Sequence, residues 1–183
     1  MAYDKTGDIM KYDRARAVAY ARRWALGRNP KYYDFSYIGG DCTNFASQCI
    51  FAGAGVMNKT PLTGWYYINA NNRTPSWTGV EELYRFLVNN HGAGPRGRVV
   101  PLDNIREGDI VQLRFDGSER FGHSPVVVDA GRGTPETVLI AAHSRDSIDR
   151  PLSSYEYSEI RPIHIVDVGN AVASTVPRVL ADT

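Results

Sequence analysis

The chain has 183 residues, of which 43% are hydrophobic and 22% are charged, the composition of an ordinary globular domain. Its 21 Lys and Arg residues nearly balance its 20 Asp and Glu residues, so nucleic acid, which needs a concentrated basic surface, is not expected as the main partner. No segment has the ~20 consecutive apolar residues of a membrane span. The sequence therefore predicts a globular protein without a membrane span, and we expect a monomer.

The predicted elements begin with helices, which span residues 12–27, 42–52 and 78–90. Asp13 is placed to cap the first helix, and Thr78 with Glu81 has the spacing of a capping box at the start of the third. Residues 56–77 lack a clear period and form a connection long enough to be a binding segment.

The second half of the chain changes to strand patterns separated by turn residues. The predicted strands cover residues 98–100, 109–115, 123–130, 137–143 and 160–168. Helices followed by a run of sequential strands indicate an α+β fold in which N-terminal helices pack on an antiparallel β-sheet. We expect one domain over residues 12–168, with an N-terminal extension over 1–11 and a C-terminal tail over 169–183.

The N-terminal sequence MAYDKTGDIM lacks a basic stretch followed by an apolar one, so we expect no secretory signal in it. The location of the protein stays open. It could act from the cytoplasm, after export by another system, after delivery or lysis, or as a chain that begins after a removed signal.

The segment GGDCTNFASQ places Cys42 at the start of the second helix. Unpaired N–H groups and the positive end of the helix dipole favour thiolate over thiol at such a position. The same N–H groups can hold an oxyanion after the sulfur attacks a carbonyl carbon. Cys42 is therefore a candidate nucleophile, although a cysteine before an apolar helix can also be a core residue.

Two histidines downstream are candidates for the base that such a thiol needs. His123 precedes a β-branched run, and His143 ends a second one. A cysteine followed by strand histidines suits a thiolate–imidazolium pair with a third group that orients the imidazole. His143 could instead be a strand-end histidine bonded to the backbone. Asp146 could orient the pair or simply cap a loop.

Other polar and aromatic residues are candidates for binding. Asp41 could contact the substrate amine or donate to an oxyanion through its backbone, and it could also act as the N-cap of the Cys42 helix. Tyr37 could supply a hydroxyl near the oxyanion or form a cleft wall. Trp65 and Trp77 could line a groove for a peptide or glycan, and core packing is equally plausible for them. Asn44 shares a helix face with Gln48, and both are expected to support the fold through buried hydrogen bonds.

No metal site or cofactor is expected. Cys42 and Cys49 do not have the spacing of a zinc site or of a disulfide within one helix, and Cys49 is expected to be buried. No HExxH-type helix occurs.

Five segments together resemble the bacterial family of the putative amidase domain, which is related to NlpC-like and CHAP-type cysteine hydrolases of the papain-like superfamily. The segments are DCTNFASQ, PSWTGVEELYRFL, REGDIVQL, GHSPVVV and AAHSRDSIDRPLSSY. The resemblance covers roughly residues 12–168. It implies a papain-like, NlpC-like core with Cys42 as the nucleophile, His123 as the base and His143 as the orienting residue.

The resemblance also implies hydrolysis of amide bonds in cell-wall peptidoglycan or related peptides, by an amidase or an endopeptidase. Two other functions stay open. A cysteine acyltransferase or transglutaminase-like enzyme would use the same residues and deliver the acyl group to an amine. A non-catalytic binding module would share the fold, although the presence of Cys42, His123 and His143 argues against it.

Overall fold

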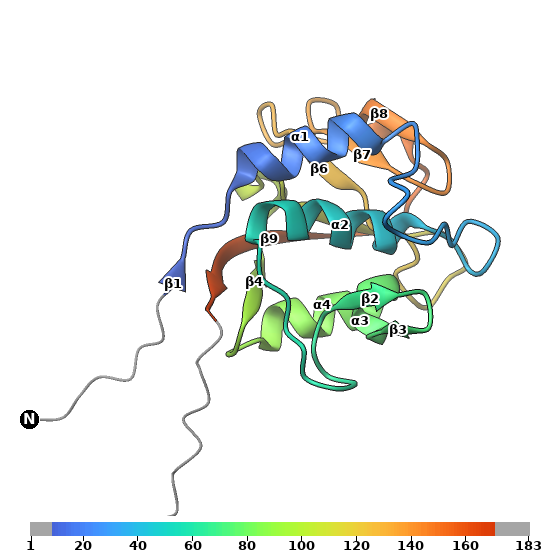
Figure 1. Ribbon diagram of the computed structural model, residues 1–183. Coiled ribbons are helices and arrows are strands. Elements are labelled where there is room, and N and C mark those ends of the chain that lie inside the picture. Colours follow the sequence, from blue (N-terminus) through green and yellow to red (C-terminus); the bar gives the residue numbers. More distant parts are fainter. Residues whose placement is uncertain (1–8, 171–183) are drawn as a thin grey trace, which may run out of the picture.

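The computed structural model describes residues 9–170 (Figure 1). The helices are α1 (Arg14–Trp24), α2 (Cys42–Ala54), α3 (Pro75–Thr78) and α4 (Val80–Asn89). The strands are β1 (Ile9–Met10), β2 (Tyr67–Asn69), β3 (Asn72–Arg73), β4 (Gly94–Val99), β5 (Ile110–Arg114), β6 (Val126–Asp129), β7 (Leu139–Ala142), β8 (Ser147–Pro151) and β9 (Glu159–Gly169). Two 3₁₀ turns, η1 (Leu102–Asn104) and η2 (Leu152–Ser154), lie between strands.

Seven of the strands form one sheet in the order β1-β9-β5-β6-β7-β8, with β4 also paired to β9. All of these pairings are antiparallel. The short β2–β3 hairpin forms a separate sheet. Helices packed with an antiparallel sheet confirm the predicted α+β class.

Helix α2 lies at the centre of the molecule, with 11 of its 13 residues buried. Figure 1 shows α1 running beside it. The two helices approach closely at Gly53, where an added Cβ would lie 2.7 Å from the carbonyl oxygen of Asp13. The side chain of Asp13 accepts a hydrogen bond from the Arg16 amide and caps α1, as predicted. Helix α2 ends at Gly55, whose φ of 67° suits glycine.

The predicted third helix is wrong at its start. Thr78 is the last residue of α3, and Gly79 breaks the helix with extended backbone angles before α4 begins at Val80. Pro75 opens α3 because its missing N–H costs nothing at the first helical position. The pattern-based prediction also missed β8, a strand at the sheet edge with polar and partly exposed residues.

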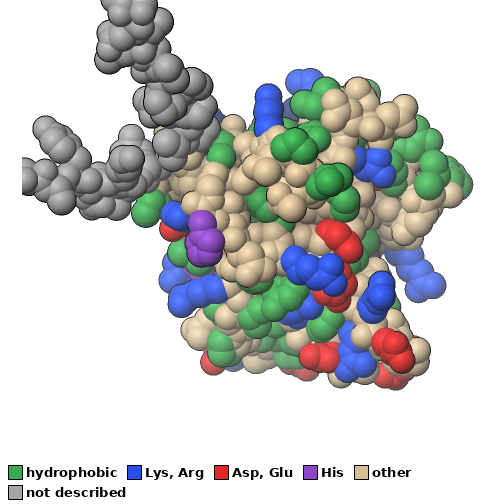
Figure 2. Space-filling view, turned by 90° about the horizontal axis from the view of Figure 1, so that it is seen from below, with side chains coloured by type: hydrophobic (Ala, Val, Ile, Leu, Met, Phe, Trp, Pro, Cys, Tyr) green, Lys and Arg blue, Asp and Glu red, His purple; other side chains and the backbone are tan. Residues whose placement is uncertain are grey.

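The two ends of the described chain meet at the sheet. Ile9 pairs with Gly169, and Met10 pairs with Val168. The rest of the predicted extension and tail, residues 1–8 and 171–183, lies outside the described residues. In Figure 2, basic and acidic side chains are interspersed over the face that the view presents. Within residues 9–170 no helix combines the length and the apolar character that a bilayer crossing requires.

Candidate active site

Cys42 is the first residue of α2, at the end of a turn built by two glycines. Gly39 and Gly40 have φ values of 87° and 103°, a region that side chains with a Cβ rarely adopt. The turn leads the chain into α2, which begins at Cys42 as the sequence predicted. Cys42 is 8% exposed, so the sulfur lies just below the surface at the helix N-terminus.

The sulfur of Cys42 lies close to the segment that carries His123. The Thr43 hydroxyl is 3.7 Å from Sγ of Cys42 and donates to Oγ of Ser124 at 3.3 Å. Burial raises the pKa of the Cys42 thiol, and the Thr43 hydroxyl and the N–H groups of Ser124 and Thr43 lower it less strongly. Desolvation therefore outweighs the groups that favour thiolate at Cys42, contrary to what its helix-start position predicts.

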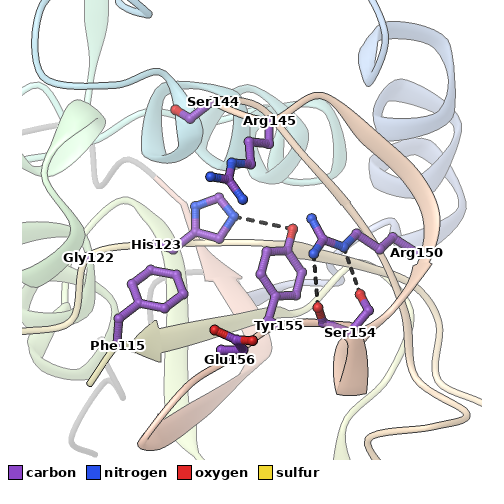
Figure 3. Close-up of a pocket in the computed structure, with 9 residues that line it drawn as sticks. All are labelled: Phe115, Gly122, His123, Ser144, Arg145, Arg150, Ser154, Tyr155 and Glu156. Carbon is purple, nitrogen blue, oxygen red and sulfur yellow. Dashed lines mark hydrogen bonds between the residues drawn. The ribbon is translucent and has the colours of Figure 1, made fainter.

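His123 is held at its position by backbone pairing with β5. Its carbonyl accepts a hydrogen bond from the Leu113 amide at 3.0 Å, so the residue forms an isolated bridge just before β6. The ring is 7% exposed and lies between Phe115 and Tyr155 (Figure 3). Its Nε2 is 3.4 Å from the Tyr155 hydroxyl. Within the described residues no hydrogen bond occupies its Nδ1.

The environment of His123 keeps its imidazole neutral. Burial and, to a smaller degree, the positive charge of Arg150 lower the pKa of His123 to about 4. Since the pKa of Cys42 is raised, the two groups rest as a neutral imidazole and a thiol near pH 7. A neutral imidazole can accept a proton, as a general base must.

His143 does not take the position that the sequence analysis gave it. Its Nδ1 is 2.6 Å from Oδ2 of Asp41, and its Nε2 is 2.8 Å from the carbonyl oxygen of Trp24. The ring stacks on Phe45 with centroids 4.0 Å apart and is 1% exposed. Both nitrogens already have partners, so the expected hydrogen bond from His143 to His123 is absent. His143 instead joins the end of β7 to α1 and to the turn before α2.

Asp41 belongs to this buried connection and does not cap α2 with its side chain. Its Oδ1 accepts from the Phe35 amide at 2.9 Å and from the Asn44 side chain at 2.8 Å, while its own amide donates to the Ser144 hydroxyl. Asp41 does occupy the N-cap position of α2, as one of the two predictions had it, but its carboxylate oxygens are buried in these bonds and neither cap the helix nor line the hollow beside His123. The first turn of α2 therefore has no side-chain cap.

Three more candidates lie away from the thiol or inside the core. Tyr37 is 95% exposed, so its hydroxyl points to solvent. Trp65 and Trp77 are fully buried and donate to Ser47 and Asn44, so they pack the core and line no groove. Asn44 supports the fold through buried hydrogen bonds, as predicted.

Asp146 is bound by an arginine and does not orient His123. Its two carboxylate oxygens accept from Nη1 and Nη2 of Arg28 at 2.9 and 3.0 Å. Arg28 also lies 3.3 Å from Asp34 and 3.6 Å from Asp41. The carboxylate therefore fastens the β7–β8 turn to the segment after α1.

Tyr155 is the site residue that sequence reasoning missed. Burial raises the pKa of its hydroxyl, and Arg150, 3.7 Å above its ring, lowers it less strongly. Tyr155 ends the segment AAHSRDSIDRPLSSY, and no spacing rule links it to His123, 32 positions earlier. Only the return of the chain through β8 and η2 brings the two side chains together.

A hollow of about 600 Å³ opens beside His123 and Tyr155 (Figure 3). Its lining comes from the β5 end, the β7–β8 turn and the segment after β8. Ser144, which binds the Asp41 amide next to Cys42, also lines it. Among residues 9–170 no group of three His, Cys, Asp or Glu side chains is placed to hold a metal ion.

Fold and site together define an α+β protein with a cysteine at the start of a buried helix and a histidine from the adjoining sheet. A family profile described as "Putative amidase domain" matches residues 11–166, and the chain belongs to this family. The description assigns the family to amide hydrolysis. The chain is also similar to "Uncharacterized protein YhbB" of Bacillus subtilis strain 168, with 32% identity over 169 residues. The match covers 88% of this chain and 52% of that relative, so the chain spans about half the relative's length. No solved structure matches the chain.

Proposed function

We propose that the protein is a cysteine-dependent amide hydrolase with Cys42 as the nucleophile and His123 as the general base. The observation that carries this proposal is the position of Cys42. The thiol lies at the uncapped N-terminus of a buried helix, against the segment that holds His123. Tyr155 would orient the imidazole, since its hydroxyl is the partner of Nε2.

The free Nδ1 of His123 would remove the proton from the Cys42 thiol as the sulfur attacks the amide carbonyl carbon. The carbonyl oxygen gains the negative charge and meets N–H groups of the first turn of α2, which no side chain caps. The hydrogen bond between Nε2–H and the Tyr155 hydroxyl would keep Nδ1 unprotonated at the start of the reaction.

Collapse of the tetrahedral intermediate breaks the C–N bond. His123 returns its proton to the leaving amine, and a thioester with Cys42 remains. A water molecule then gives a proton to His123 and adds to the thioester carbon. Cys42 leaves as a thiol after it regains that proton, and the carboxylic acid is released.

The proposed substrate is peptidoglycan or a peptide related to it, and the proposed fold is a papain-like core like that of the NlpC-like and CHAP-type hydrolases. The resemblance of the five motif segments supports both. The hollow beside His123 is large enough for a few residues of a peptide. Its lining combines aromatic side chains, Phe115 and Tyr155, with the charged side chains of Arg145 and Arg150, which suits a peptide with both apolar and charged groups.

The test is mass spectrometry of defined muropeptides after incubation with the protein, with Cys42→Ala as the control. The proposal predicts fragments separated at an amide bond with the mass of one water added. It fails if the wild type leaves every muropeptide intact or if Cys42→Ala gives the same fragments. A parallel reaction with an added primary amine identifies an acyltransferase, because the product then carries the amine instead of water.

A further inference from the structure

Two arginines lie at the hollow beside His123 without acidic partners. Among residues 9–170 neither Arg145 nor Arg150 forms an ion pair, and the Arg145 guanidinium donates no hydrogen bond there. Figure 3 shows both guanidinium groups beside His123 and the Tyr155 hydroxyl. Glu156 also lines the hollow, but within the described residues it forms no ion pair with either arginine, so an anion between the two guanidinium groups would remove the repulsion between them.

The sequence supplies acidic neighbours for these arginines, yet the fold directs those neighbours elsewhere. Asp146 follows Arg145 directly, but it is bound by Arg28. Asp149 precedes Arg150, but it is bound by Arg22 of α1 at 2.9 Å. The carboxylates of the β7–β8 hairpin thus bind arginines on the helix side, and within residues 9–170 its two guanidinium groups have no acidic partner at the hollow.

Arg150 is fixed before any ligand arrives. Its guanidinium carbon is 3.7 Å from the centroid of the Tyr155 ring, and its Nε and Nη2 donate to Ser154 at 2.7 and 3.1 Å. Within the described residues its Nη1 has no hydrogen-bond partner. A stacked and hydrogen-bonded guanidinium with a free N–H edge is well suited to a carboxylate.

We propose that Arg145 and Arg150 bind a free carboxylate of the substrate close to the amide bond that is cleaved. This inference rests on the proposed function and names the substrate class: acidic peptides. The carboxylate could belong to a residue within the peptide or to its C-terminus, and both would present the same group to the arginines.

Binding of this carboxylate would also affect the base. The positive charge of Arg150 contributes to the lowered pKa of His123. A carboxylate paired with Arg150 offsets that charge, so the imidazole becomes a stronger base in the complex. An acidic substrate should therefore have a higher kcat as well as a lower KM. With a substrate that lacks the carboxylate, His123 remains a weak base.

The experiment compares three muropeptides with the same stem peptide. One carries its free carboxylates, one has its internal carboxylates converted to carboxamides, and one has only its C-terminal carboxylate converted. Turnover is measured for wild type, Arg145→Gln, Arg150→Gln and Arg150→Lys. The control is Arg132→Gln, an exposed arginine in the loop before β7.

We expect wild type to prefer the free-carboxylate muropeptide over one carboxamide form by about 100-fold in kcat/KM, and each Gln variant to reduce that preference about tenfold. The carboxamide muropeptide that wild type cleaves more slowly than the free-carboxylate muropeptide shows which carboxylate the arginines bind. Arg150→Lys should keep part of the preference, and Arg132→Gln should keep all of it. The apparent pKa of the acid limb of kcat should be higher for the carboxylate than for the carboxamide.

Binding is measured separately by calorimetry with Cys42→Ala protein and the same three muropeptides. Cleavage without a carboxylate preference, or an equal loss on all muropeptides in the Gln variants, would overturn the inference and leave the proposed function standing. Carboxylate-selective binding without any cleavage by wild type would overturn the proposed function and leave the arginine site standing. Equal binding of all three forms would overturn the arginine site.

Discussion

His123 lies just before β6 and His143 lies just after the neighbouring strand β7, yet the two rings have different hydrogen-bond partners. His143 has an acceptor on each ring nitrogen and an aromatic ring against its face. His123 has one long contact to a hydroxyl and borders a hollow. Burial alone does not distinguish the proposed catalytic histidine from the structural one, since both are buried. A ring nitrogen left without a partner is the more useful sign.

A second aspartate–histidine pair, in which the aspartate is buried and the histidine is partly exposed, supports this interpretation of His143. His164 of β9 contacts Asp109 through Nδ1 at 2.8 Å, and Asp109 also accepts from Arg14 at 2.7 Å. That pair joins α1 to β9 and lies away from the hollow beside His123. In the same way, Asp41 and His143 join the turn before α2 to β7. We interpret both aspartate–histidine pairs as connections between elements.

The largest expected effect is on turnover after loss of either member of the proposed pair. Cys42→Ala should lower kcat by about 10³ or more, and His123→Ala by about 10² to 10⁴. Both variants should remain folded at pH 7, because neither side chain holds elements together. Turnover of a muropeptide, with circular dichroism of each variant, measures this. A folded Cys42→Ala protein with wild-type turnover would contradict the mechanism.

His143→Ala should act mainly on stability. The substitution leaves the buried Asp41 carboxylate without its closest partner, which costs about 3 kcal/mol of unfolding free energy or more. Urea denaturation at pH 7 gives the loss, and His123→Ala is the matched control, with a much smaller change. If His143→Ala unfolds at the same urea concentration as wild type, the connecting role is wrong.

Burial of His123 should also make the free energy of unfolding depend on pH. The folded pKa of about 4 lies below the unfolded value of 6.5, so between these values the unfolded chain binds a proton that the folded chain does not. Unfolding free energy should therefore fall as the pH drops from 6.5 to 4, by up to about 3 kcal/mol from this group. The contribution is the difference between wild type and His123→Gln. If the plots of unfolding free energy against pH run parallel for the two proteins, His123 is not desolvated as described.

The smallest effect is expected for Tyr155→Phe. The change removes the hydroxyl that contacts Nε2 and keeps the ring under Arg150. An orienting group sets the tautomer and moves no proton itself, so kcat should fall by roughly tenfold. Thermal unfolding controls for the fold. A loss as large as that of His123→Ala would make Tyr155 an acid or base in its own right.

The sequence allowed a good prediction of the α+β class and of the residues that open the nucleophile helix. Glycine turns, helical spacing and β-branched runs are local signals, and GGDC, GHS and the strands β5 and β6 carry them clearly. The helix break has a local signal in Gly79, which the helical spacing of the apolar residues around it outweighed in the prediction. The edge strand β8 carries no clear local signal, because its pairing with β7 decides it.

The partners of the site residues were harder to predict. The sequence analysis gave the orienting role to His143, because it could not show that Asp41 and the Trp24 carbonyl occupy both ring nitrogens. For Trp65 and Trp77 the sequence left a groove and the core equally plausible, and their N–H groups find buried acceptors in the core. It missed Tyr155, which only the fold of the β8 segment brings to His123.

The most direct test of the central claim, that His123 and not His143 serves Cys42, is the rate of Cys42 alkylation by iodoacetamide between pH 4 and pH 10. The rate is followed by peptide mapping in wild type, His123→Ala and His143→Gln, with the buried Cys49 as an internal control. We expect His123→Ala to slow the reaction of Cys42 near pH 7, because no base accepts the thiol proton, and His143→Gln to keep the wild-type profile. A slowed reaction in folded His143→Gln together with an unchanged one in His123→Ala would contradict it.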